Sequence, residues 1–454
     1  MRTKQGAMWV HCVAFLVLFC PMTVQPLQQV AVLGSGIAGS TVARRLADSG
    51  QFEITVFECG RGVGGRTSTR ITRDGKYQFD HGAQYISTPK TAAFRQELDS
   101  WIERGWVQRW EGRFGTVDLS EGTVKVEDPG SKDRFVGKPR MCSICENLLD
   151  HDQITVHTQT RACVQQTTTV CMGDKPKWIV GVESDNADHD ASNSHNENDD
   201  FAISFGTFDW LVVSDRLSAT GARTDLRQIP IGTFREFVNR ITNVPSLTLM
   251  VTLEEPLPIA LDGILFGSSR QTQDEDSWNT SIGWAARDSS KPGRMCSGSG
   301  ECWVVQSDTE SAQKLIAEVS SRGMGFAETK AAVADEAKTM LLNDFSETMG
   351  WLLHRIENES VEEHESKKSM PRIVSAIGHR WGAAFPGGAA TLTTTSEANA
   401  DRMELLFNQN FVACGDYFPQ TQPGRIEGAF LSGHEAARSI LETLAVGGDN
   451  NGTD

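Results

Sequence analysis

The sequence predicts an α/β protein of two domains, the first of them built on a parallel sheet. Three features predict this fold: the length of the chain, a glycine-rich turn between an apolar run and a helical pattern near the N-terminus, and a strand–helix pattern near the C-terminus. The 454 residues are enough for two domains with a large core, and 39% apolar residues are typical of a globular chain.

The first 28 residues are predicted to be a signal peptide or an N-terminal anchor. Arg2 and Lys4 precede an apolar run from Ala7 to Phe19, which has the length of a secretory h-region and is short for a membrane span. The expected location is the secretory pathway or the extracellular space, with an uncleaved anchor or an organellar address as alternatives. No other segment reaches membrane-spanning length.

The fold is predicted to open with a nucleotide-binding unit. A strand, a GxGxxG turn, a helix and a second strand ending on an acid follow one another as Gln29–Leu33, Gly34 to Gly39, Ile37–Asp48, Phe52–Phe57 and Glu58. This order is the βαβ arrangement of a Rossmann-type domain.

Each part of the unit has a physical role. Gly34 allows the tight turn, Gly36 lets the backbone approach a pyrophosphate, and Gly39 allows the helix to pack closely on the strand. The pyrophosphate is expected at the helix N-terminus, beside Ile37 and Ala38. Glu58, followed by Cys59, is placed to bind the hydroxyls of an adenosine ribose, which favours NAD or FAD over NADP.

Further motifs distinguish FAD from NAD. Gly64-Gly65-Arg66 follows the acid, and Asp80-His81-Gly82-Ala83-Gln84-Tyr85 comes next. Near the C-terminus, Gly415-Asp416 is followed by Glu427-Gly428-Ala429 and an amphipathic helical pattern. With His379-Arg380-Trp381, these motifs make the chain resemble the flavin amine oxidase clan and, within it, the renalase-like branch.

The resemblance, which spans about residues 29–445, implies non-covalent FAD and assigns residues to it. Gly64, Gly65 and Arg66 would contact the phosphates and ribityl chain, and Asp416, after Gly415, would bind the ribityl chain. The amides of Glu427, Gly428 and Ala429 would face the flavin N1/C2 edge. The segment His81, Gly82, Ala83 and Gln84 would lie near the isoalloxazine, and Trp381 and His81 are the candidate catalytic residues.

Several side chains also admit structural interpretations. Asp80 and His81 could cap a turn, Trp381 could be a core aromatic residue, and Arg380 could belong to a surface ion pair. Lys291, the nearest candidate for the lysine that the clan often places near flavin N5, lies in a loop-like context and is not assigned to the site.

The cysteines favour structural roles. The Cys142–Cys145 CxxC precedes a helical stretch without the second nucleotide motif of a disulfide reductase, so we interpret it as structural, as we do Cys414. Of ten cysteines, the two at positions 12 and 20 fall in the signal, and the even number left permits disulfides without requiring them.

The domains are predicted to be discontinuous. Residues 29–100, 136–225 and 401–445 would form the FAD-binding domain, whereas 101–135 and 226–400 would form a substrate domain with a mixed sheet and helices. The longest helix is expected at Glu328–Leu353. Residues 184–200 are predicted to be a disordered acidic loop between strands Trp178–Val182 and Phe201–Phe205, and 446–454 a flexible tail.

The predicted function is that of an FAD-dependent oxidoreductase. The chain has 43 Lys and Arg against 59 Asp and Glu, so its formal net charge of −16 would repel nucleic acid. The resemblance implies hydride transfer from a small molecule, a dihydronicotinamide, to flavin N5, with O2 as oxidant and hydrogen peroxide as product. The alternatives are an amine or carotenoid-type oxidoreductase of the same clan and a non-catalytic FAD-binding protein. No metal site is expected.

Overall fold

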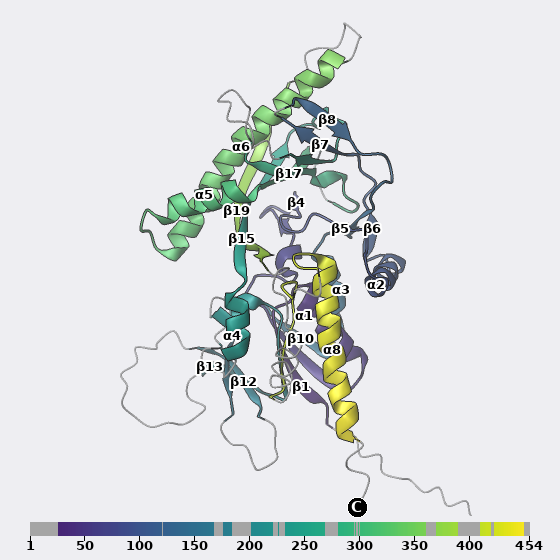
Figure 1. Ribbon diagram of the computed structural model, residues 1–454, viewed down its shortest axis with the longest axis vertical. Helices are drawn as coiled ribbons and strands as arrows, with labels where there is room; N and C mark the ends of the chain where they lie inside the picture. Colours follow the sequence, from purple (N-terminus) through teal and green to yellow (C-terminus); the bar gives the residue numbers. More distant parts are fainter. Residues whose placement is uncertain are drawn as a thin grey trace, which may run out of the picture.

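The structure, a computed structural model, consists of two units stacked along the longest axis of the molecule (Figure 1). It describes residues 26–119, 121–167, 176–183, 201–220, 226, 232–267, 280–294, 296, 298, 300–359, 369–388, 409–418 and 422–448. Nearly all of the expected signal and the whole acidic insertion at 184–200 lie outside these residues. No helix within them has both the length and the apolar character needed to cross a bilayer.

The lower unit in Figure 1 is built on a five-stranded parallel sheet. The strands lie in the order β10 (Ile154–His157), β2 (Phe52–Phe57), β1 (Gln28–Leu33), β14 (Trp210–Val213) and β20 (Phe411–Ala413). Elements cover both faces, so central strands such as β14 are buried along their whole length and are apolar without alternation. Segments from three distant parts of the chain therefore meet in one sheet.

One face of this sheet is covered by helices. Val30 and Val32 of β1 share a core cluster with residues of α1 (Ile37–Asp48) and α8 (Ile426–Gly448), and α3 (Ser143–Leu149) packs beside α1. Helix α8 runs down the side of the unit in Figure 1 and ends three residues inside the stretch expected to be the tail.

The other face is covered by a small antiparallel sheet. Its strands are β11 (Cys163–Gln166), β12 (Trp178–Glu183) and β13 (Phe201–Phe208), and helix α4 (Gly232–Asn239) lies beside them. Ala31 and Leu33 form a cluster with Trp178 and Phe208 there. The antiparallel pairing of β12 with β13 confirms the predicted hairpin.

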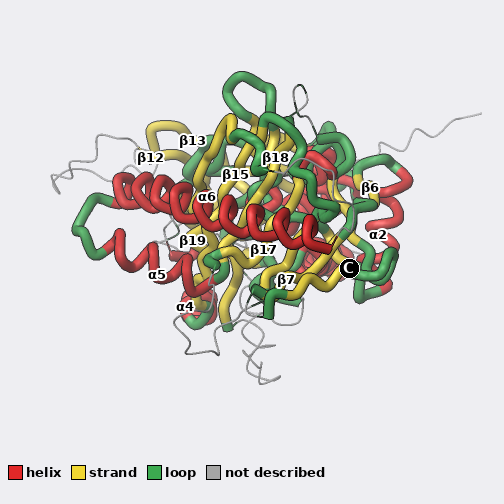
Figure 2. The backbone as a smooth tube through the Cα atoms, turned by 90° about the horizontal axis from the view of Figure 1, so that it is seen from above, coloured by secondary structure: helices red, strands yellow, loops and turns green. Residues whose placement is uncertain are grey.

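The upper unit is a seven-stranded mixed sheet with two helices on one face. The strands lie in the order β19 (Ile373–Gly387), β15 (Thr242–Leu253), β18 (Glu301–Ser307), β17 (Ile282–Arg287), β16 (Gly263–Phe266), β7 (Phe114–Asp118) and β8 (Thr123–Val126). Figure 2 shows helix α6 (Phe326–Glu359) lying across these strands beside α5 (Thr309–Ser320). Helix α6 contains the predicted Glu328–Leu353 stretch, which confirms that helix.

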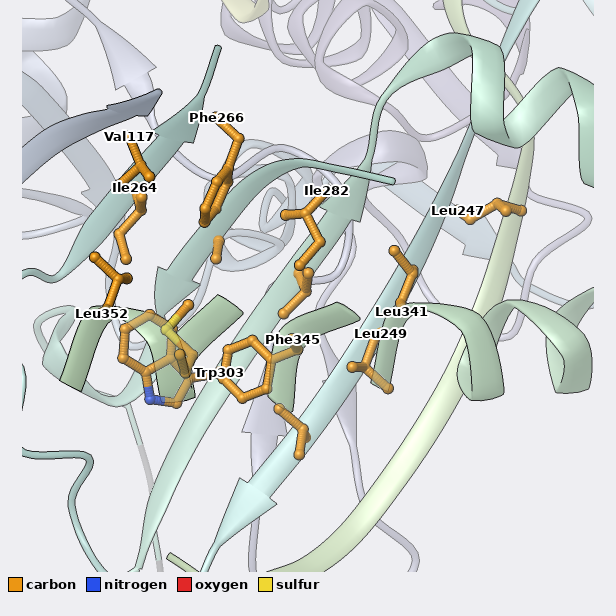
Figure 3. Packing of buried hydrophobic residues seen from close by; sticks show 14 of the residues in the cluster. Val117, Leu247, Leu249, Ile264, Phe266, Ile282, Trp303, Leu341, Phe345 and Leu352 are labelled. Carbon is orange, nitrogen blue, oxygen red and sulfur yellow. The ribbon is translucent and has the colours of Figure 1, made fainter. Parts of the chain in front are cut away.

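The core of the upper unit lies between the sheet and α6 (Figure 3). Trp303 of β18 and Phe345 of α6 are fully buried, with ring centroids 5.8 Å apart, and Leu249 and Leu341 belong to the same cluster. Burying two such aromatic side chains contributes several kcal/mol to the attachment of the helix, at about 1.5–3 kcal/mol for each large apolar side chain.

Short elements connect the two units near the site. They are the β3–β4 pair (Arg70–Ile71 and Gln78–Phe79), the three-stranded sheet of β5 (Ile86–Ser87), β9 (Arg134–Gly137) and β6 (Val107–Arg109), helix α2 (Ala92–Glu103), and the 3-10 turns η1 (Gly65–Thr67), η2 (Arg216–Thr220) and η3 (Asp288–Ser290). Strand β4 leads directly into the segment 80–85, which forms one wall of the cavity described below.

Candidate functional site

The glycine turn after β1 leaves the N-terminus of α1 open. Gly34 has φ +98°, which favours glycine, and a Cβ on Gly39 would lie 2.1 Å from the Gly34 carbonyl oxygen, so both positions require glycine. Gly36 is the N-cap of α1 and provides no side-chain hydrogen bond to the helix. The first amide groups of α1, at Ile37 and Ala38, are thus free to bind an anion.

Space beside Gly36 fits a pyrophosphate. A Cβ on Gly36 would have the Gly64 oxygen, 3.9 Å away, as its nearest neighbour, so the protein itself has room for a side chain there and does not require glycine at this position. Gly36 and Gly64 form an isolated β-bridge, and Gly64 is held at φ +113°. Two glycine backbones thus face each other at the positive end of a helix, which is the arrangement that phosphate binding uses.

Glu58 is buried at the end of β2 and orders this turn. Its carboxylate accepts hydrogen bonds from the Ser35 amide (3.0 Å), the Ser35 hydroxyl (2.6 Å) and the Gly60 amide (2.7 Å). The Cys59 thiol, 3.8 Å from Oε1, is only a weak donor, so of the about four acceptor positions of a carboxylate one remains for a ribose hydroxyl. Cys59 beside it is exposed.

A cavity between the two units has a volume of about 620 Å³, within the range of cofactor sites. Both units contribute its walls. Residues predicted for the site that line it are Gly36, Ile37, Ala38, Gly64, Arg66, Gly82, Ala83, Gln84, Trp381, Gly415, Asp416, Glu427 and Ala429. Those that do not line it are Gly34, Gly39, Glu58, Cys59, Gly65, His81 and Gly428.

Two residues predicted to bind the cofactor are paired with each other. The Arg66 guanidinium donates to both carboxylate oxygens of Asp416, at 2.6 and 2.5 Å, and also to the Ala384 carbonyl at 3.2 Å. Asp416 is 5% exposed, so this bidentate pair neutralises a buried carboxylate on the cavity wall. Arg66 belongs to the lower unit and Ala384 to β19, so the same guanidinium also joins the two units.

The N-terminus of α8 lies at the cavity wall, but the Ala429 amide, which was expected to face the flavin, donates to the Arg425 carbonyl at 3.0 Å within the first turn of the helix. Ile426, Glu427 and Ala429 line the cavity, and the positive end of the helix favours an anion there. The Glu427 side chain has a structural role, because its carboxylate accepts from the Lys90 amide and from the amide and hydroxyl of Thr91 at 2.8–3.1 Å. This contact fixes α8 to the start of α2.

The segment 80–85 forms the wall next to Arg66. The Ala83 amide donates to the Arg66 carbonyl at 2.8 Å. A Cβ on Gly82 would lie 2.0 Å from the same oxygen, so only glycine at position 82 lets these two backbone segments approach so closely. The Gln84 amide nitrogen donates to the carbonyls of Asp80 (2.5 Å) and Gly82 (3.0 Å), which shapes the loop.

His81 lies behind the wall. Its ring stacks on Trp381 (centroids 5.2 Å apart) and meets His379 edge-on (4.8 Å), and its own carbonyl accepts from Trp381 Nε1 at 2.9 Å. Burial, with Arg70 nearby, lowers the pKa of His81 to about 4, and burial next to His81 lowers the pKa of His379 to about 3. His81 is therefore neutral at pH 7 and holds Trp381, whereas Trp381 itself faces the cavity.

A buried group of charges, here named the Asp80 cluster, supports this wall from behind. It consists of Asp80, Asp288, Lys291 and Arg294. Lys291 Nζ contacts Asp288 Oδ1 at 2.6 Å and Asp80 Oδ2 at 3.5 Å, and Arg294 donates through Nε to Asp80 at 2.9 Å. Burial opposes ionisation of Asp80, but Arg294 and Lys291 hold its pKa below the usual range. All four side chains are 0% exposed, so their charges are compensated by one another and not by water.

Lys291 reaches the site only through another residue. Its Nζ contacts Gln84 Oε1 at 3.2 Å, and Gln84 lines the cavity, but Lys291 does not. Lys291 therefore contacts the cavity wall from behind rather than the cavity itself. The sequence did not reveal its burial, because Asp80 and Lys291 are far apart along the chain.

Much of the wall contributed by the upper unit was not predicted. Gln306 on β18 donates to the Gly82 carbonyl at 2.8 Å, and Ser246 on β15 lies nearby on the same wall. Other unpredicted lining residues are Thr67, Tyr85, Ile86, Ser87, Ser214, Leu265, Trp284, Ala384, Phe385, Pro386, Pro423, Gly424, Arg425 and Ile426. Some of these residues could have been predicted because they adjoin the recognised motifs in the sequence: Tyr85 follows Gln84, and residues 423–426 precede Glu427.

The family comparisons agree with this geometry. Residues 32–99 match the family described as NAD(P)-binding Rossmann-like domain, and residues 324–441 match the family described as flavin containing amine oxidoreductase. The first match contains the glycine turn and Arg66. The second contains Trp381, Asp416 and most of α8.

Solved structures share the fold. A protein assigned as a protoporphyrinogen oxidase from Exiguobacterium sp. 255-15 superposes with a TM-score of 0.56 at 11% identity, over 91% of this chain and 99% of that one. Putrescine oxidase bound to putrescine gives a TM-score of 0.51 at 11% identity, over 92% of this chain and 99% of that one.

The residues present thus fit FAD in three respects: the first amides of α1 follow a glycine N-cap, a Cβ on Gly36 would meet no protein atom closer than the Gly64 oxygen at 3.9 Å, and the cavity has a suitable volume. Each of the two family matches contributes residues to that cavity. The chain is an FAD-dependent oxidoreductase, and the part of it at residues 324–441 is similar to the flavin containing amine oxidoreductase family.

Proposed function

We propose that the protein is a renalase-like oxidase that takes a hydride from a dihydronicotinamide and passes the electrons to O2, with hydrogen peroxide as product. The observation that carries this proposal is the state of the acidic residues on the cavity wall. Among the described lining residues the carboxylates are Asp416 and Glu427. Asp416 is held by Arg66, and Glu427 by Lys90 and Thr91.

This pattern favours a neutral reacting group over a cation. An ammonium ion that entered the cavity would lose hydration and would find both described carboxylates already bound, which is costly. A dihydronicotinamide ring is uncharged, and its carboxamide needs only hydrogen-bonding partners. Gln306 uses Nε2 on the Gly82 carbonyl, so its amide oxygen can accept from a carboxamide, and the Ser246 hydroxyl lies on the same wall.

The protein residues would orient the ring and exclude water. FAD, when bound, supplies the hydride acceptor at N5 and the reactivity with O2. Trp381 and Trp284 place aromatic surfaces on the cavity, and Leu265 adds apolar surface. Hydride transfer requires no protein base, and the neutral, buried His81 acts by holding Trp381 in place.

A second candidate rests on the apolar rim of the same cavity. Leu265 and Phe385 are 51% and 50% exposed, and both line the cavity beside Trp284 and Trp381. This surface also suits an uncharged amine or a long apolar substrate, such as those of an amine or carotenoid-type oxidoreductase. The two candidates differ in the reductant that the bound cofactor accepts.

An anaerobic titration distinguishes them. The FAD-loaded protein is mixed with isomeric dihydronicotinamides, and in parallel with putrescine and benzylamine, while the oxidised-flavin absorbance is followed. Rapid loss of that absorbance with a dihydronicotinamide, and peroxide formation after air is admitted, is the expected result. Loss with an amine alone would replace the proposal by the second candidate, and no loss with any reductant would indicate a non-catalytic FAD-binding protein.

A further inference from the structure

Two thiols outside the cofactor cavity lie close enough to react with each other. The Sγ atoms of Cys296 and Cys302 are 3.7 Å apart, and both residues belong to a small apolar cluster with Phe79, Met250 and Val304. Cys302 is at the start of β18 and is 1% exposed, whereas Cys296 is partly exposed in the connection between β17 and β18. One sulfur is thus accessible to a soluble oxidant, and the other is directly behind it.

The surroundings favour a bond that persists once it has formed. Burial raises the pKa of both thiols, and their proximity to each other raises that of Cys302 further. A thiol of high pKa is a poor leaving group, so a disulfide between these two sulfurs would be attacked slowly by external thiols. Phe79 and Met250 also shield the buried sulfur.

The CxxC pair lacks this arrangement. Cys142 Sγ contacts the Arg140 guanidinium at 3.2 Å and Glu146 at 3.5 Å, whereas Cys145 Sγ contacts the Thr67 hydroxyl at 3.7 Å. Cys296 Sγ too has a polar partner, the Gly300 carbonyl at 2.8 Å, but it also contacts the Cys302 sulfur, whereas the sulfurs of the CxxC pair contact Arg140, Glu146 and Thr67. They therefore serve as an internal control for oxidation of cysteines in this protein.

We propose that Cys296 and Cys302 form an intramolecular disulfide. The two thiols lose two protons and two electrons as the sulfur–sulfur bond forms, and a low-molecular-weight disulfide accepts them and is reduced to two thiols. This chemistry belongs to an oxidising compartment, which is the location expected from the N-terminal segment. It does not depend on the substrate of the enzyme.

The bond would fasten the connection that carries three of the four residues of the Asp80 cluster. Residues 288–296 leave β17, contribute Lys291 and Arg294 to Asp80, and then bring Cys296 to a β-bridge with Tyr77, next to β4. Joining Cys296 to Cys302 would close this connection onto the first residues of β18. The disulfide would thereby hold the wall segment 80–85 in place from behind.

Peptide mapping of the full-length FAD-loaded protein tests the bond. The protein is equilibrated with glutathione disulfide, its free thiols are blocked with N-ethylmaleimide under acidic denaturing conditions, and it is digested without reduction. Glu301 lies between the two cysteines, so a protease that cuts after glutamate leaves the two halves joined only by a disulfide. We expect joined peptides for the wild type and separate peptides for Cys296→Ser, with Cys142 and Cys145 blocked in both.

Thermal unfolding and FAD release then test the role. Reduction is expected to lower the melting temperature by several degrees and to speed FAD release several-fold in the wild type, but not in Cys296→Ser. Cys142→Ser, as a matched control, should respond to reduction as the wild type does. Complete blocking of Cys296 and Cys302 after oxidation, or a glutathione adduct on Cys296 alone, would overturn the disulfide. Joined peptides with no effect of reduction would overturn its role in holding the wall.

Discussion

Replacing Gly36 by alanine separates the folding of the protein from the binding of its cofactor. Gly36 has φ −71° and ψ 179°, an extended conformation that alanine adopts without strain. The added methyl group would meet only the Gly64 oxygen, at 3.9 Å, which is an ordinary van der Waals distance. The protein itself therefore has room for the side chain, and a bound pyrophosphate does not.

The expected magnitudes follow from these contacts. Alanine is a poorer helix N-cap than glycine, which costs the protein under about 1 kcal/mol. A methyl group forced into a filled contact costs about 1–3 kcal/mol, and here that cost falls on the complex. FAD should therefore bind about 5- to 150-fold more weakly, while the free energy of unfolding of the cofactor-free protein changes little.

The assay is a fluorescence titration of cofactor-free protein with FAD, paired with urea unfolding. Gly62→Ala is the matched control, because a Cβ at that position meets nothing within 4 Å and Gly62 does not line the cavity. Gly39→Ala is the contrasting variant, since its methyl would lie 2.1 Å from the Gly34 carbonyl and would disturb the fold itself. Wild-type affinity for FAD in Gly36→Ala would refute the placement of the pyrophosphate.

Three further substitutions test the supporting structure. Lys291→Met should lower the free energy of unfolding, measured by urea denaturation, by about 3–5 kcal/mol, because it leaves the buried carboxylate of Asp288 without its partner at 2.6 Å. Adding Asp288→Asn to this variant should restore part of the lost stability. The pKa of His379 is lowered to about 3 from about 6.5, so the unfolded chain binds more protons than the folded protein, and the free energy of unfolding falls as pH drops from 6.5 toward 3. In a His379→Asn variant this free energy should fall by up to about 1.4 kcal/mol less for each pH unit. Equal pH slopes for the wild type and the variant would contradict the burial of this ring. Trp381→Phe removes the 2.9 Å hydrogen bond to the His81 carbonyl and should raise the KM for the reducing substrate about 5-fold while the affinity for FAD is unchanged. Loss of FAD from this variant would instead mean that the Trp381 ring holds the cofactor.

The sequence predicted the parts of the site that are local in the chain. The turn from Gly34 to Gly39 depends on residues a few positions apart, so its spacing alone carries the geometry. The same is true of the start of α8 and of the segment that follows β4. Strands β1 and β2 of the lower unit were also predicted, since they are short apolar runs on either side of the glycine turn and its helix, whereas β10 and β14 were not.

Contacts between distant segments were not predictable from these patterns. Arg66 and Asp416 were each expected to contact the cofactor, but their pairing across the cavity depends on the fold. The role of Lys291 likewise depends on Asp80, which is brought beside it only when β4 packs near the connection after β17. Gln306 lies on β18, which is buried along almost its whole length, so its sequence has no alternation of polar and apolar residues to indicate which side chain faces the cavity.

The assignment of the cavity to FAD is tested by the visible spectrum of the purified protein after incubation with FAD and removal of unbound cofactor. We expect an oxidised-flavin spectrum shifted from that of free FAD, and release of intact FAD, with none attached covalently, when the protein is unfolded. A protein that retains no flavin after this treatment, while remaining folded by circular dichroism, would contradict the assignment of the cavity to FAD.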